Sequence, residues 1–176
     1  LFNSDVLLYD RATESLWSQI GARAISGPRR GEALATIPIA NTTWGAWRRE
    51  HPESLVLSRN TAYSRDYDRN PYAEYAEDEA LMFPVQFRTH GQHPKTPVLG
   101  VEINGQARAY PLPAFPETGQ HRVQDELGGE RITVLIDSDA QSGRVLDDQG
   151  EEVTSLISYW FAWFAFHPDT DRYEPG

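Results

Sequence analysis

Apolar residues recur at helical spacing in two places along the 176-residue chain. Trp44, Trp47 and His51 follow one another at intervals of three and four residues, which places them on one face of a helix. The same Trp-x-x-Trp-x-x-x-His-Pro phrase returns over residues 160–168. The pattern therefore predicts two short Trp-rich helices, whose indoles we expect to lie in a core.

The ends of these two helices are marked by capping residues and by prolines. Hydroxyl side chains that can cap a helix stand at Thr42 or Thr43 and at Ser155 or Ser158. Pro52 and Pro168 each follow the histidine and push it away from helical geometry. We expect helices over about 42–51 and 156–167.

Strand-like runs outnumber the helices. Each helix is preceded by an apolar run, an aspartate and a polar turn, in "VLLYDRATESLWSQ" and "ITVLIDSDAQSGRVLDD", so that Asp10 and Asp137 hold equivalent places. Both runs are typical of β-hairpins. Two further hairpins are indicated by Asn104-Gly105, the strongest short turn signal, and by Gly128-Gly129.

These elements predict an α+β fold, in which antiparallel hairpins dominate and a pseudo-twofold repeat relates two halves. We expect one domain over residues 1–176, with a first half over 1–58, an aromatic connection over 59–83 and a second half over 84–176. The second half begins with the hairpin "VLGVEINGQARAYPL", and the first half has no counterpart of it. The pattern thus indicates an N-terminally incomplete repeat, with an unpaired strand edge beside "DVLLYD".

Composition excludes several classes of function. The formal charge of −10 disfavours binding to nucleic acid or anionic lipid. The chain has no cysteine, and so no disulfide or thiol nucleophile of its own. It has no apolar run long enough to span a bilayer. No phosphate-binding glycine loop, GxSxG or HExxH motif is present.

The aromatic connection contains the strongest candidates for ligand binding, which are Tyr63, Arg65, Asp66 and Tyr67. Arginine offers a planar fork for a carboxylate or phosphate, and the tyrosines offer flanking rings. The alternative interpretation is structural: the tyrosines pin the connection to the sheet, and Arg65 pairs with Asp66.

Two histidines raise the possibility of a metal site. His90 and His93 stand in the loop "RTHGQHPKTP", where both imidazoles could bind one transition metal. Such a site needs a further ligand, for which His121 or a carboxylate is available. The alternative is a surface loop with two polar rings and no metal.

The chain resembles the bacterial and archaeal family called domain of unknown function 3179. The phrases that carry the resemblance run almost end to end and include "TTWGAWRREHPESLVLS", "AYSRDYDRNPY" and "HPKTPVLGVEINGQARAYPL". The resemblance implies an extracytoplasmic setting, periplasmic or secreted. It also implies a Cys-Pro-x-Cys motif and another hairpin upstream of the segment seen here.

Two classes of function follow. The first is an extracytoplasmic binding or assembly module whose open sheet edge is completed by another protein chain or by the missing N-terminal segment. The second is a metal- or thiol-dependent enzyme whose cysteine motif lies upstream. In that enzyme this chain would supply residues such as Trp17, Gln19, Arg65, Asp66 and His93. The chain itself requires no cofactor, and a transition metal is the one candidate that the enzyme interpretation brings.

Overall fold

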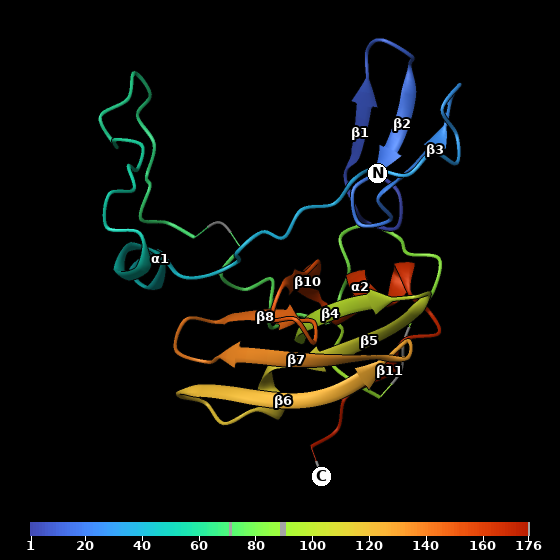
Figure 1. Ribbon diagram of the computed structural model, residues 1–176. Coiled ribbons are helices and arrows are strands. Elements are labelled where there is room, and N and C mark those ends of the chain that lie inside the picture. The colour runs from blue at the N-terminus through green and yellow to red at the C-terminus, as the bar shows by residue number, and fades with distance from the viewer. Residues whose placement is uncertain (71, 89–90, 176) are drawn as a thin grey trace.

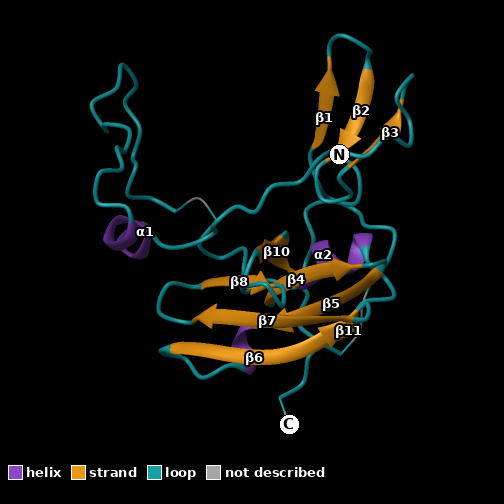
Figure 2. Ribbon diagram, viewed as in Figure 1, coloured by secondary structure: helices purple, strands orange, loops and turns teal. Residues whose placement is uncertain are grey.

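A computed structural model describes residues 1–70, 72–88 and 91–175, and His90 lies outside this range. The elements are β1 (Leu7–Asp10), β2 (Ser15–Ser18), β3 (Arg23–Ser26), α1 (Trp44–Glu50), β4 (Pro97–Ile103), β5 (Gln106–Pro111), the 3-10 turn η1 (Leu112–Ala114), β6 (Gln120–Leu127), β7 (Glu130–Asp137), β8 (Ser142–Leu146), β9 (Glu152–Val153), β10 (Ser155–Tyr159), α2 (Trp160–Phe166) and β11 (Asp171–Arg172). The α+β class is confirmed: the described strands form antiparallel sheets, apart from one short parallel pair, and the helices are short. Figure 2 shows this predominance of strands and loops.

The strands form three sheets. The first has the order β1-β2-β3, the second β10-β4-β5-β11 and the third β6-β7-β8-β9. The second and third sheets lie together in the lower part of Figure 1, while the first stands apart above them. The chain thus has a two-sheet body formed by its later residues and a small separate sheet near its N-terminus.

Two of the predicted hairpin turns form as expected. Asn104 and Gly105 both have positive φ, at 51° and 78°, and connect β4 to β5. Gly128 and Gly129 do the same between β6 and β7, at 61° and 80°. A side chain at Gly128 would also place its Cβ 2.3 Å from the carbonyl oxygen of Ile103, so the close approach of the two turns requires glycine there.

The main core lies between the second and third sheets. Its fully buried members come from β4 to β8 and are Leu99, Val101, Tyr110, Leu127, Ile132, Val134, Ile136 and Val145. A second cluster joins α2 to the second sheet through Val98, Ala109, Trp160 and Trp163. Neighbouring residues of β4 belong to different clusters, with Leu99 and Val101 in the first and Val98 in the second, so this strand is covered on both faces.

The helices begin later than the sequence pattern predicts. Thr43 caps α1, and its hydroxyl accepts a hydrogen bond from the Ala46 N–H at 3.3 Å. Residues 155–159 are not helical, because they pair with β4 as strand β10. Tyr159 is therefore the N-cap of α2, without a side-chain capping bond, and the prediction of a Ser155 or Ser158 cap is wrong.

The prediction that the indoles are buried holds for one helix and fails for the other. Trp160 and Trp163 of α2 are buried against the second sheet. Trp44 of α1 is 44% exposed, and Trp47 is half-buried. The reason is that α1 has no sheet packed over its Trp face as α2 does, and Figure 1 shows α1 at the periphery, away from the first sheet.

Candidate functional site

The residues predicted from the sequence to bind a ligand are spread over two separate parts of the molecule. Tyr63, Arg65 and Tyr67 lie on the loop that follows α1, which projects away from the sheets in Figure 1. The Arg65 guanidinium carbon lies 5.9 Å from the centre of the Tyr63 ring, and the Tyr67 hydroxyl bonds the Thr61 hydroxyl at 2.8 Å. These side chains are exposed, and they line neither of the two cavities described below.

The expected pairing of Arg65 with Asp66 does not form among the described residues. The Asp66 carboxylate instead accepts a hydrogen bond from the backbone N–H of Asp68 at 3.1 Å, as in an Asx turn. The tyrosine that does pin the connection to the body is Tyr75, whose ring lies 6.1 Å from that of Tyr159. The loop is therefore anchored at its C-terminal part and not at Tyr63 or Tyr67.

Trp17 lies on β2 of the first sheet and Gln19 directly follows that strand, and Figure 1 shows this sheet apart from the loop after α1. Trp17 is half-buried on β2, directly opposite Leu8 of β1 and Ala24 of β3. Gln19 is exposed just beyond β2, and its carbonyl accepts a hydrogen bond from the Ala22 N–H at 3.2 Å. Among the candidates predicted from the sequence, Trp17 is the one that lies beside an edge strand, because it pairs with Leu8 of β1.

That edge is strand β1. It pairs with β2 from Leu7↔Ser18 to Asp10↔Ser15, and no described strand pairs with its other side. Leu8 and Tyr9 are 48% and 56% exposed. Edge strands in natural proteins are usually protected by lysine, proline, bulges or covering loops, and β1 has neither lysine nor proline.

The opposite edge of the same sheet is protected. The pairing of β3 with β2 shifts register between Leu16 and Trp17, and a further bridge joins Arg23 to Ala33. The long edge strand of the third sheet, β6, alternates buried and exposed positions and carries Arg122, Asp125 and Glu126. The first sheet therefore has one protected edge, at β3, and one apolar edge open to pairing, at β1.

Exposed apolar side chains are concentrated in the same part of the chain. Nearly all of the exposed large hydrophobic residues lie within residues 1–87, and Leu156 is the exception. The buried core residues, by contrast, come almost entirely from residues 98–165. The large apolar side chains of residues 1–87 are therefore mostly exposed, while those of residues 98–165 form the core.

Sequence reasoning identified the edge but missed Leu8 and Tyr9 as its exposed side chains. The available signal was the matched order of apolar run, aspartate and polar turn around Asp10 and Asp137. Strand β7, which ends at Asp137, pairs with β6 along its whole length, whereas β1, which ends at Asp10, has no described strand on its other side.

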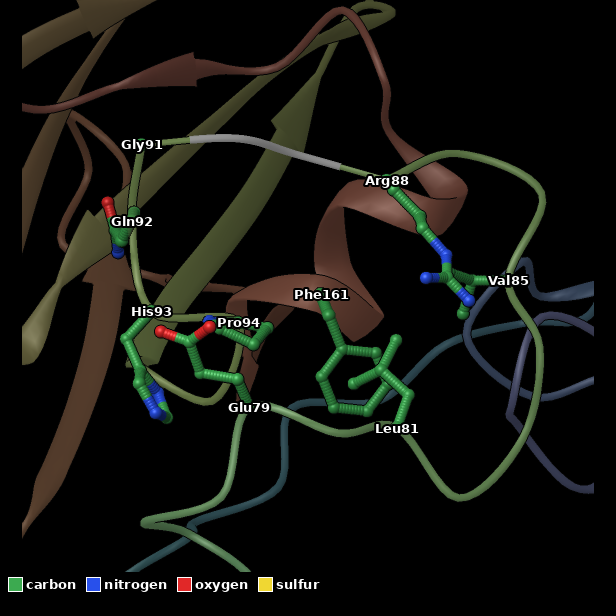
Figure 3. A pocket seen from close by; sticks show the side chains of 9 residues that line it. All are labelled: Glu79, Leu81, Val85, Arg88, Gly91, Gln92, His93, Pro94 and Phe161. Carbon is green, nitrogen blue, oxygen red and sulfur yellow. The ribbon is translucent and has the colours of Figure 1, made fainter.

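A cavity of about 530 Å³ lies between α2 and the loop that precedes β4 (Figure 3). Figure 3 shows Glu79 and His93 on one side, Arg88 and Val85 on the other, and Phe161 of α2 between them. Its lining residues are Glu79, Leu81, Val85, Arg88, Gly91, Gln92, His93, Pro94 and Phe161. Glu79 and Arg88 lie on opposite sides of the apolar Phe161, so the cavity can bind a small ligand that carries both a positive and a negative group.

His93 has both ring nitrogens engaged. The Lys95 N–H donates to Nδ1 at 3.2 Å, so Nδ1 is the unprotonated nitrogen, and Nε2 lies 3.3 Å from the Glu77 carbonyl oxygen, to which it donates. His121, the proposed further ligand, stacks on Phe115. No group of three or more histidines, aspartates or glutamates suited to a metal occurs in the part of the chain that the structure describes.

The Lys95 ammonium is buried without a hydrogen-bond partner among the described atoms. It lies 3.6 Å from the centre of the Tyr75 ring, close enough for a cation–π interaction. Burial raises the pKa of Tyr75, with a further contribution from Tyr159. The contact between the Lys95 ammonium and the neutral Tyr75 ring thus stabilises the attachment of the aromatic connection to the two-sheet body.

Neither described helix is long and apolar enough to cross a membrane, since α1 and α2 have seven residues each.

Comparison with known proteins identifies the family. No curated protein and no solved structure matches the chain. A family model, described as protein of unknown function DUF3179, matches residues 1–170. Since the match covers nearly the whole chain and agrees with the resemblance seen in the sequence, the chain belongs to the DUF3179 family.

Proposed function

We propose that the chain is an assembly module, which is completed by a β-strand of a partner polypeptide that pairs along β1. The observation that carries the proposal is the open side of β1, with Leu8 and Tyr9 exposed and no protecting lysine or proline. Main-chain hydrogen bonds supply the affinity in such strand addition, and side chains on alternate positions supply the specificity.

The hairpin β7–β8 supports the proposal as an internal template. Asp10 pairs with Ser15 as Asp137 pairs with Ser142, across loops of the same length. The residue before each serine has positive φ, 57° at Glu14 and 50° at Gln141. Strand β7 is covered on its other side by β6, so the same kind of hairpin accepts a third strand elsewhere in this chain.

The experiment compares self-association of the wild-type chain with that of Leu8→Lys by sedimentation velocity. In the absence of another partner, an open apolar edge pairs with a second copy, so the wild-type chain associates at tens of micromolar and Leu8→Lys associates at least tenfold more weakly. Met82→Lys, at an exposed hydrophobic residue outside the described strands, is the control and behaves as wild type. A monodisperse wild-type monomer with cooperative unfolding contradicts the proposal.

The extracytoplasmic location belongs to the same proposal. It is supported by the family resemblance and is tested by fractionating cells that express the native protein. Recovery of the protein in the cytoplasm overturns it.

A second candidate is the metal- or thiol-dependent enzyme whose cysteine motif lies upstream. The cavity beside His93, with Glu79 and Arg88 across an apolar floor, favours it as a place for a substrate. Metal analysis of the protein isolated from its native source tests it. Stoichiometric copper, zinc or iron that is lost when the upstream cysteines are replaced supports the enzyme.

A further inference from the structure

Helix α1 with its following turn and helix α2 with its following turn have the same local structure. The N-cap residues Thr43 and Tyr159 have φ and ψ of −72° and 147° and of −73° and 146°. The C-cap residues His51 and His167 agree as closely, at −127° and 69° and at −128° and 67°.

The side chains of the two motifs repeat as well. The rings of Trp47 and His51 lie in contact with their centres 4.0 Å apart and their planes tilted by 34°, and those of Trp163 and His167 stack at 3.9 Å and 26°. The indole N–H of each second tryptophan donates to a hydroxyl seven residues later. It reaches Ser54 at 2.8 Å in the first motif and Thr170 at 2.9 Å in the second.

In the second motif these features dock onto one hairpin, β4–β5. The Trp163 ring covers Gly100 of β4, where an added Cβ would lie 2.3 Å from Cε3 of the indole. The His167 Nδ1 lies 3.3 Å from a carboxylate oxygen of Glu102. The residues directly after the turn, Asp171 and Arg172, form β11 and pair in parallel with β5.

In the first motif none of the three corresponding contacts, of Trp47, of His51 and of the residues after the turn, is made with a hairpin among the described residues. His51 is exposed, and no described carboxylate pairs with it. The counterparts of β11 are Leu55 and Val56, which belong to no described strand, and Leu55 and Leu57 are 97% and 94% exposed. A cavity of about 530 Å³ also separates α1 from β6, β7 and β8, so the present packing of Trp47 is incomplete.

We propose that α1 and residues 55–57 dock onto a β-hairpin supplied by a partner chain. One strand of that hairpin places a glycine under Trp47 and an acidic residue two positions later beside His51. Its second strand pairs in parallel with residues 55–57. This surface is distinct from β1 and does not depend on the strand addition proposed above.

Charge complementarity favours a partner with further acidic residues. The last turn of α1 carries Arg48 and Arg49, where α2 carries the apolar Phe164 and Ala165. Neither arginine forms a close ion pair among the described residues, and Arg49 lies near enough to Asp137 to help lower the pKa of that carboxyl. A hairpin bound over the Trp face of α1 lies next to these two cations, so carboxylates on it gain favourable contacts.

The test uses the full chain and a cyclised peptide with the sequence of residues 97–111, which contains Gly100 and Glu102. Cyclisation is needed because an isolated hairpin is marginally stable in water. Titration calorimetry is expected to show binding, with protection of the amides of residues 55–57 from hydrogen exchange. The same peptide with Gly100→Leu is expected to bind at least tenfold more weakly.

Variants of the protein separate docking from folding. Trp47→Ala weakens peptide binding at least tenfold, while Tyr72→Ala, an exposed aromatic on the projecting loop, leaves it unchanged. His51→Gln keeps the fold because the imidazole is exposed, and its loss of affinity is not additive with that of Glu102→Gln in the peptide.

Three outcomes overturn the inference. They are the absence of protection at residues 55–57, equal binding of the Gly100→Leu peptide, and protection that is present without peptide and rises with protein concentration. The last shows that a second copy occupies the surface. Leu8→Lys is expected to leave peptide binding unchanged, so failure of the β1 proposal and failure of this one are distinguishable.

Discussion

The indole of Trp163 lies directly on Gly100, with the position of an ideal Cβ on that glycine only 2.3 Å from the Cε3 atom of the ring. Gly100 is in the middle of β4 and is paired on both sides, with Leu156 of β10 and Ala109 of β5. Neither the strand nor the indole can therefore move away from an added methyl group without breaking other contacts.

Gly100→Ala is expected to destabilise the protein by about 1–3 kcal/mol, the usual cost of overpacking a core. Gly45→Ala is the control, because a Cβ at this helical glycine meets only the far end of Arg49, at 4.0 Å. We expect that control to be neutral or to stabilise by up to about 1 kcal/mol. Urea unfolding measures both, and equal stabilities of the two variants contradict the packing argument.

The two tryptophans at matched positions are expected to differ in their contribution to stability. Trp163→Ala removes a buried indole and costs about 3–5 kcal/mol. Trp47→Ala removes a half-buried one beside a cavity and costs about 1–2 kcal/mol. Similar losses for both variants in chemical denaturation show that α1 is packed as closely as α2.

Asp125 forms the most connected ionic group of the body. Its carboxylate accepts two hydrogen bonds from Arg108 Nη1 at 2.7 Å and one from the Tyr110 hydroxyl at 2.5 Å. Burial alone disfavours the carboxylate, but the hydrogen bonds from Arg108 and Tyr110 outweigh it and hold the pKa of Asp125 below its ordinary 3.8. Burial of its ring, and then the hydrogen bond to Asp125, raise the pKa of Tyr110.

Because the folded-state pKa of Asp125 is depressed, its contribution to stability is complete above pH 3.8 and is lost as the pH falls through the lower folded value. Asp125→Asn is expected to cost about 1–3 kcal/mol at neutral pH and to flatten the loss of stability on acidification. Asp171→Asn, at an exposed partner of Arg108, is the control and costs less. If the stability of wild type and of Asp125→Asn falls with the same slope on acidification, Asp125 is not the group responsible.

His167 gives a second pH dependence, at higher pH. Burial lowers its pKa from the ordinary 6.5, and the nearby Glu102 carboxylate only partly offsets that shift. The unfolded chain therefore binds a proton more readily than the folded one, and stability falls as the pH drops from 6.5 through the folded pKa. Thermal unfolding between pH 7.5 and 5 should show this slope in wild type, and His167→Gln should reduce it; an unchanged slope assigns it to other groups.

Local signals in the sequence predicted the features that depend on a few neighbouring residues. Asn104-Gly105 and Gly128-Gly129 specify turns through positive φ, and the prolines after His51 and His167 end both helices. These features need no knowledge of the rest of the chain. They were therefore correct in the structure.

Features that depend on distant partners could not be predicted. Residues 155–159 become a strand because β4, more than fifty residues earlier, offers an edge. Trp44 and Trp160 share one sequence phrase, yet only Trp160 has a sheet to cover it. The placement of Arg65 on a projecting loop, away from Trp17, likewise follows from tertiary structure and has no local signal.

The central claim is that β1 accepts a partner strand, and hydrogen exchange at the amides of residues 7–10 tests it most directly. We predict that their protection in the isolated chain rises with protein concentration, while the amides of β7, which is already paired on both sides, keep constant protection. Protection at residues 7–10 that is the same at every concentration, in a chain that stays monomeric, would contradict the account.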